Sequence, residues 1–161
     1  MMKWLSRLFA RGEAALSPAT VRDAAAIAAL HAASFRRGWS EQEVETLLLD
    51  RHVITDRASL RGRVTGFIMA RLVEDEAEIL SVAVARAAQG RGLAGRLLGL
   101  NLRRLAGLGA RAVFLEVDEN NAPAIRLYAR AGFREVARRP NYYPTGTGKA
   151  ANALVLRRDL G

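Results

Sequence analysis

The chain has 161 residues, of which 50% are hydrophobic and 25% are charged, and these values fit one globular domain. It contains no cysteine, which excludes a disulfide framework, a thiolate nucleophile and any cysteine-ligated metal site. Its 25 lysines and arginines against 16 acidic residues give a formal net charge of +9, which favours polyanionic partners. Nucleic acid, a phosphate-rich cofactor and an anionic membrane surface would each be attracted by this positive charge. The two histidines, His31 and His52, show no metal-ligand spacing, so we expect no metal site.

The first residues predict a short amphipathic helix, which we place at residues 1–14, ahead of a single domain over the remainder of the chain. Trp4 and Leu8 fall on one face of this helix and Arg7 and Arg11 on the other. The arginines interrupt the apolar stretch that a signal peptide needs, and no apolar run reaches the length of a membrane span. We therefore expect a cytoplasmic protein. The helix either packs on its own domain, which we favour, or binds a surface or partner.

Two helices are expected next. Asp23 is placed to cap an alanine-rich helix over residues 24–34. Ser40 and Glu43 form a capping box ahead of a second helix, whose hydrophobic positions begin at Val44.

The rest of the chain mixes strands and helices. Turn signals separate three expected strands, over residues 52–60, 64–73 and 77–84. Leucines at helical spacing then predict a helix from Leu93 to Leu105. After these come a buried-type strand over residues 112–117, a helix opened by Asn121 and Pro123 and closed at Gly132, and strands near residues 133–138 and 152–156. This mixture predicts an α+β or α/β fold.

A glycine-rich turn joins the third strand to the leucine-striped helix. The strand ends in Val82-Ala83-Val84, and the turn reads Gln89-Gly90-Arg91-Gly92-Leu93-Ala94-Gly95. Glycine lets a ligand approach the backbone closely, and the first N–H groups of a helix have no partner within it. Such a turn is typical of a pyrophosphate site, although glycine-rich turns also occur for structural reasons alone. It is neither a Walker loop nor a dinucleotide-binding fingerprint.

Two polar residues follow in apolar surroundings. Glu116 lies inside a buried-type strand, where a charge needs a partner or a task, and Tyr128 lies on the next helix. Each has a structural interpretation, as a salt-bridged glutamate and a core tyrosine. Each also has a chemical one, as a base and an acid.

These segments resemble the GNAT superfamily of N-acetyltransferases. The resemblance is carried by Gln89-x-x-Gly92-x-Ala94 and by the run from Asn121 through Leu127-Tyr128 to Gly132-Phe133. It covers about residue 15 to the end of the chain. Matches at Trp39-Ser40, Val82-Ala83-Val84, Leu115-Glu116-Val117 and Asn141-Tyr142-Tyr143-Pro144 are similar to the bacterial ribosomal-protein-alanine N-acetyltransferases.

The resemblance implies a mostly antiparallel sheet of seven strands, splayed between the fourth and fifth, with acetyl-coenzyme A in the opening. It implies that Glu116 activates the amine and Tyr128 protonates the departing thiolate. It assigns Trp39, Tyr142 and Tyr143 to the acceptor peptide. The coenzyme is assigned to Val82, Ala83, Val84, Gln89, Gly90, Arg91, Gly92, Leu93, Ala94, Gly95 and Asn121.

Three positions depart from the family pattern. Ala94 replaces the final glycine of the loop, Gly38 stands where the close relatives carry proline, and Ala150-Ala151 replace an acidic pair. The last two border the expected peptide groove, so they bear on the acceptor and not on the coenzyme.

Amine chemistry favours a protein N-terminus as the acceptor. An α-amine has a reference pKa of about 7.8 and a lysine amine about 10.4, so a neutral lysine is the harder nucleophile to present. The sequence therefore predicts transfer to the N-terminal alanine of a small-subunit ribosomal protein. The alternatives are a GNAT enzyme acting on a free small amine or a protein lysine, and a basic ribosome- or RNA-binding module on the same fold. We expect no sequence-specific nucleic acid binding, since exposed aromatic residues are scarce.

Overall fold

The computed structural model describes residues 13–143 and 150–161, with Tyr143 described by its backbone only. The helix expected over residues 1–14 lies almost wholly outside this part of the chain, as does Pro144. Within the described ranges, no helix is both long and apolar enough to cross a membrane.

Seven strands form one sheet in the order β1-β2-β3-β4-β5-β7-β6. All neighbouring pairs are antiparallel except β4 and β5, which are parallel. The mostly antiparallel seven-stranded sheet is therefore confirmed. The strands are β1 (Ala15–Pro18), β2 (Val53–Leu60), β3 (Arg63–Val73), β4 (Glu76–Val84), β5 (Ala112–Asp118), β6 (Arg134–Tyr143) and β7 (Ala151–Asp159).

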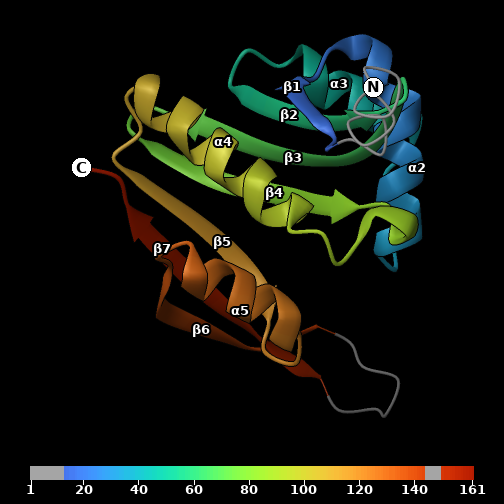
Figure 1. Cartoon of the computed structure of the whole chain (residues 1–161). Helices are drawn as coiled ribbons and strands as arrows, with labels where there is room; N and C mark the ends of the chain where they lie inside the picture. Colours follow the sequence, from blue (N-terminus) through green and yellow to red (C-terminus); the bar gives the residue numbers. More distant parts are fainter. Residues whose placement is uncertain (1–12, 144–149) are drawn as a thin grey trace, which may run out of the picture.

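The sheet is splayed between β4 and β5, as expected. The two strands pair only where Glu76, Ala77 and Glu78 face residues 112–114, and beyond that point they diverge (Figure 1). A bulge at Leu80 lies at the beginning of the open part of β4, because Met69 lies opposite Ser81 while Ala70 lies opposite Ile79. The splay leaves the ends of β4 and β5 facing a gap instead of each other.

Helices cover both faces of the sheet (Figure 1). Helices α4 (Leu93–Gly107) and α5 (Ala122–Arg130) lie on one face, and α2 (Ala24–Ser34) and α3 (Glu41–Leu49) on the other. Short 3-10 turns cover Val21–Asp23 and Arg86–Ala88.

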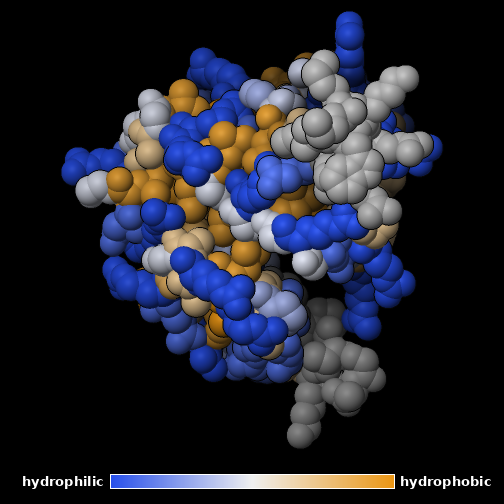
Figure 2. Space-filling model, viewed as in Figure 1, coloured by the Kyte–Doolittle hydropathy of each residue, from blue (hydrophilic) through white to orange (hydrophobic). Residues whose placement is uncertain are grey.

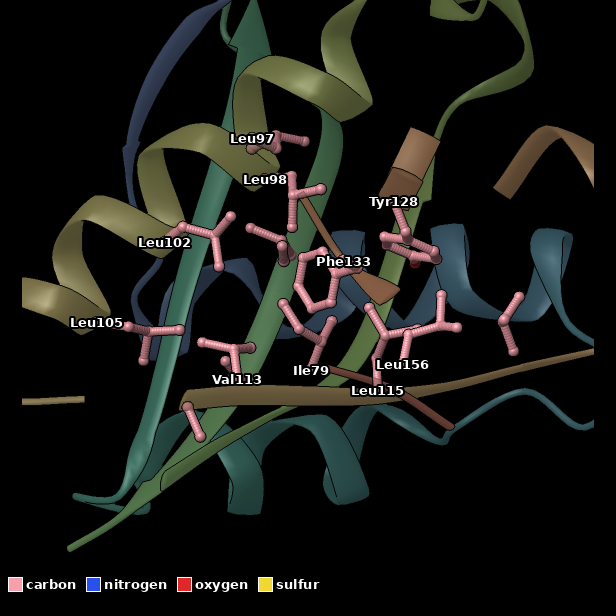
Figure 3. Close-up of a cluster of buried hydrophobic side chains, with 14 of the residues drawn as sticks. Ile79, Leu97, Leu98, Leu102, Leu105, Val113, Leu115, Tyr128, Phe133 and Leu156 are labelled. Carbon is pink, nitrogen blue, oxygen red and sulfur yellow. The ribbon is translucent and has the colours of Figure 1, made fainter. Parts of the chain in front are cut away.

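The larger hydrophobic core lies under α4 and α5. The leucines predicted from helical spacing point from α4 into it, where they meet Val113, Leu115 and Phe133 (Figure 3). A second core joins α2 and α3 to the opposite face, with Ile27, Val44 and Phe67 fully buried. Figure 2 shows hydrophilic residues along the outer edges of the first face, with hydrophobic residues between them over α4 and α5.

Several local predictions need correction. Asp23 does not cap α2, because its carboxylate accepts a hydrogen bond from the N–H of Thr20 at 2.8 Å and pairs with Arg57. Ser40 caps α3 through the N–H of Glu43, as predicted. Strand β1 was not predicted, because four residues show no periodicity. Strand β6 extends past the expected residue 138 and carries Tyr142, and Pro140 is tolerated there because β6 is an edge strand.

Candidate active site

The divergence of β4 and β5 opens a cleft of about 480 Å³. Its walls are residues 79–84 of β4 and 115–118 of β5, and it extends to the beginnings of α4 and α5. The fold thus brings together site residues that lie far apart in the sequence. Those lining the cleft are Val82, Ala83, Val84, Gln89, Ala94, Glu116, Asn121 and Tyr128.

The glycine-rich turn supplies the start of α4. Gly90 and Gly92 have φ angles of +80° and +73°, values that favour glycine, and a Cβ at either position would meet no atom of the described residues within 4 Å. Gly92 is the N-cap of α4 and has no side chain to accept hydrogen bonds from the first N–H groups of the helix. An open approach, a helix N-terminus and unsatisfied N–H groups together fit a pyrophosphate.

The side chains of this turn do not all face the cleft. The Gln89 amide donates to the carbonyl oxygen of Val84 at 3.1 Å and so ties the turn to the end of β4. Leu93 is buried in the core, which leaves its N–H as the group available to a ligand. Arg91 lines a separate small hollow beside Arg96.

Asn121 opens α5 and also borders the cleft. Its side-chain oxygen accepts a hydrogen bond from the N–H of Ala124 at 3.3 Å, which leaves the amide NH₂ group to donate to a ligand.

The structure of Tyr128 agrees with both interpretations of the sequence, a core tyrosine and an acid at the site. The residue is 9% exposed, and its ring packs edge-on against Phe133, with ring centroids 5.7 Å apart (Figure 3). The residue also lines the cleft. The core therefore fixes a phenol at the border of the site.

Glu116 has the ion-pair partner that its position on an apolar strand requires. Nη1 of Arg139 donates to its Oε1 at 2.7 Å, and the Glu116 side chain is 27% exposed. This hydrogen bond raises the pKa of Arg139 above its ordinary value. The guanidinium also lies over the ring of Tyr142, 4.2 Å from its centre. No spacing in the sequence points to Arg139, because its proximity to Glu116 depends on the strand order.

A second groove, of about 450 Å³, opens beside α3. Trp39 and Tyr142, two of the three residues predicted to contact an acceptor, line it together with Glu78 and Arg71. The side chain of Tyr143, the third, lies outside the described residues. Groove and cleft share three residues: Ile79, Leu80 and Glu116. Two separate hollows thus meet at one carboxylate.

In the part of the chain that the structure describes, no group of three or more histidine, aspartate or glutamate side chains is arranged to hold a metal ion.

Comparison with known proteins identifies the class. Residues 24–133 match the acetyltransferase (GNAT) family, so the chain belongs to this family, whose members use acetyl-coenzyme A as co-substrate. The cleft described above fits that molecule, with the turn before α4 suited to its pyrophosphate.

Individual proteins that are similar to this chain have a more specific description than the family. The chain is 34% identical over 118 residues to the [ribosomal protein bS18]-alanine N-acetyltransferase of Escherichia coli K12, covering 73% of this chain and 78% of that protein. It is 37% identical over 95 residues to the Haemophilus influenzae protein of the same description, covering 59% of this chain and 64% of the relative, slightly under two thirds of its length.

Solved structures agree on the fold. The crystal structure of the E. coli ribosomal-protein-S18-alanine N-acetyltransferase superposes with a TM-score of 0.85 and 28% identity, covering 92% of this chain and 94% of that chain. A Salmonella typhimurium protein, solved with its cofactor acetyl-coenzyme A, gives a TM-score of 0.83 at 21% identity, covering 93% and 95% of the two chains. The latter similarity concerns the fold alone.

Proposed function

We propose that this protein transfers the acetyl group of acetyl-coenzyme A to the α-amine of an N-terminal alanine, on a small-subunit ribosomal protein. The observation that carries the proposal is the meeting of cleft and groove at Glu116. An acyl donor in the cleft and a peptide end in the groove reach the same carboxylate from two sides. The names of the E. coli and H. influenzae relatives supply the acceptor. A ribosomal acceptor places the reaction in the cytoplasm.

Residues on both walls of the cleft bind acetyl-coenzyme A. Along Val82, Ala83 and Val84, the backbone groups that point away from β3 find no partner on β5, so they are available to a pantetheine arm. The N–H groups at the start of α4 bind the pyrophosphate, and the amide of Asn121 reaches the arm from the opposite wall. Trp39 and Tyr142 form apolar walls for the first residue of the acceptor.

Glu116 and Tyr128 divide the proton transfers. Acetyl-coenzyme A supplies a thioester. The amine nitrogen of the acceptor forms a bond to the carbonyl carbon of this thioester, and the carbon–sulfur bond breaks. Glu116 takes the proton that the amine loses, through a water molecule or directly. Tyr128, on the other wall, donates a proton to the sulfur as it departs. The amine proton thus leaves on one side while the thiolate is protonated on the other.

Mass spectrometry of acetylated peptides tests the proposal. The wild-type protein is incubated with acetyl-coenzyme A and a peptide that begins with alanine and contains an internal lysine. We expect one acetyl group, placed on the first residue by fragmentation. The matched control is the same peptide with its N-terminus already blocked, which should gain nothing. Acetylation of lysine only, or of a free polyamine or aminoglycoside only, would contradict the proposed acceptor.

A further inference from the structure

Arg139 reaches Glu116 across an intervening strand. Glu116 lies on β5 and Arg139 on β6, and β7 separates the two in the sheet. The residue of β7 opposite Arg139 is Ala153, which in turn lies opposite Asp118 of β5. A methyl group at Ala153 leaves room for a long side chain to cross, and the contact to Glu116 measures 2.7 Å.

Arg139 also contacts the acceptor groove. Its guanidinium carbon lies 4.2 Å from the centre of the Tyr142 ring, and Tyr142 lines the groove. A guanidinium over an aromatic face is attracted by the ring electrons, so Tyr142 holds the arginine in addition to its carboxylate partner. Glu116, Arg139 and Tyr142 thus form one connected row from the cleft to the groove.

The contact uses one oxygen of the carboxylate, Oε1, and leaves Oε2 to a water or to an amine. An ionised carboxylate on a flexible side chain has several rotamers, and one strong charge-assisted hydrogen bond selects among them. The pair also carries no net charge. A bare carboxylate at the same place would instead favour the protonated form of an incoming amine, and an ammonium group has no lone pair with which to attack.

We infer that Arg139 is a positioning residue for the acceptor amine: it orients Glu116 and cancels its charge, so that the amine is presented in its neutral, nucleophilic form. This inference rests on the proposed function, in which Glu116 accepts the amine proton. It goes beyond that function because it names a residue that sets the pH at which the acceptor reacts.

Other charged side chains lie around Glu116, and they are the same in the wild type and in the Arg139 variants that test the inference. Besides Glu116, the charged and titratable side chains lining the cleft and the groove are Arg36, Arg71, Glu78, Asp118, Tyr128 and Tyr142. Arg139 itself stays charged throughout an assay range, since its pKa is raised.

The test compares pH–rate profiles for an alanine-initiated peptide from pH 6 to 9.5. For Arg139→Gln we expect kcat to fall about tenfold at pH 7, and the midpoint of its rise with pH to move up by about one unit. The loss should shrink to less than about threefold at pH 9.5, and the KM for the peptide should not increase. Arg139→Lys, which keeps the charge, should retain the wild-type midpoint.

The chain offers a matched control at the neighbouring position. Arg138 lies on the same strand, opposite Leu154 of the α5-facing core, and pairs with Glu119 and Glu135 instead of Glu116. Arg138→Gln therefore removes the same charge from the same strand, and we expect it to leave the pH midpoint and kcat unchanged. A structural effect on β6 would appear in both variants.

A double-mutant cycle with Glu116→Gln supplies the second readout. If Arg139 acts through Glu116, adding Arg139→Gln to Glu116→Gln should lower kcat by less than about twofold further. An additive loss, or an unshifted midpoint in Arg139→Gln, would overturn the inference. If Arg139→Gln fails to fold, Arg139→Lys decides, because a midpoint shifted in spite of the retained charge would equally contradict the inference.

The two proposals fail separately. Wild-type protein that acetylates only lysine amines would contradict the proposed acceptor, and the same Arg139 comparison would then be made on lysine. Wild-type protein that acetylates the alanine peptide, with an Arg139→Gln profile parallel to its own, would contradict only the inference about Arg139.

Discussion

Trp39 stacks on His31, with ring centroids 4.0 Å apart and an interplanar angle of 9°. The backbone N–H of Trp39 also donates to Nδ1 of His31 at 3.0 Å, so this nitrogen carries no proton in the folded protein. His31 is 5% exposed, and Trp39 forms one wall of the acceptor groove. The protonation state of a buried histidine is thus coupled to the shape of the groove.

Acid should destabilise the protein through His31. Burial lowers the pKa of this histidine below its ordinary value of 6.5, an effect that Glu43 partly opposes. The unfolded chain therefore takes up the proton first, and the stability that neutral His31 provides is present above about pH 6.5 and lost as the pH falls below it. Thermal unfolding between pH 7.5 and 5.5 should show this slope in the wild type and a flatter one in His31→Gln. His52→Gln, at an exposed position, should keep the wild-type slope, and equal slopes in all three proteins would contradict the assignment.

A side chain at Gly92 should block the coenzyme. A Cβ at Gly92 would meet no atom of the described residues within 4 Å, and the residue adopts a φ of +73°, so Gly92→Glu adds both a bulky anion and local strain. Gly62, in the β2–β3 turn, has φ of +77° with the same open surroundings, so Gly62→Glu shares the strain alone. Titration calorimetry should show at least tenfold weaker acetyl-coenzyme A binding for Gly92→Glu only. Equal affinity in both variants would place the pyrophosphate elsewhere.

Arg104 should matter to stability and its neighbour should not. Asp56 is fully buried and accepts hydrogen bonds from Nδ2 of Asn101, at 3.0 Å, and from Arg104. Arg104→Met leaves the buried carboxylate without its cation, which should lower the free energy of unfolding by about 3 kcal/mol. Arg103→Met, at the exposed adjacent position, should change it by less than about 0.5 kcal/mol in the same denaturant titration. Similar losses in both variants would mean that the helix surface, not the ion pair, is responsible.

Much of the fold could be predicted because local signals agree with it. The leucine spacing of α4 and the Asn121 cap of α5 fix those helices, and Gly132 follows α5 with φ of +89°. The alternating burial of β4 and the turn at Gly62 likewise set the antiparallel strands. In each of these cases, a pattern of a few neighbouring residues is enough to predict the helix or the strand.

What could not be predicted depends on distant partners. Asp23 looks like a helix cap, but its carboxylate is used by Arg57, 34 residues away in the sequence. Arg139 meets Glu116 only because β7 inserts between β5 and β6 with a particular register. Strand pairing of this kind is decided by the whole sheet, so no spacing in the sequence reveals it.

Loss of the base at Glu116 should be rescued by high pH. Glu116→Gln keeps the shape of the side chain but removes its capacity to accept a proton. We expect turnover to fall about a hundredfold at pH 7 and the deficit to shrink toward pH 9, where the α-amine deprotonates in solution. Steady-state rates with an alanine-initiated peptide measure this. A deficit that is constant with pH would mean that Glu116 serves only to hold Arg139 in place.

Loss of the hydroxyl group at Tyr128 should be rescued less by high pH. Its ring is fixed by Phe133, so Tyr128→Phe keeps the packing and removes only the hydroxyl group. A thiol has a reference pKa of about 8.5 and a phenol about 10, so at neutral pH the phenol still carries the proton that it donates to the departing thiolate, and the resulting phenolate regains a proton from water. Turnover should therefore fall by about tenfold or more while acetyl-coenzyme A affinity and the unfolding temperature stay close to wild type, the pattern of an interaction made in the transition state. Raising the pH should restore less activity than it does for Glu116→Gln, because a basic medium does not replace an acid. If Tyr128→Phe turns over like the wild type from pH 6 to 9, the hydroxyl is not the acid, and the residue has a structural role.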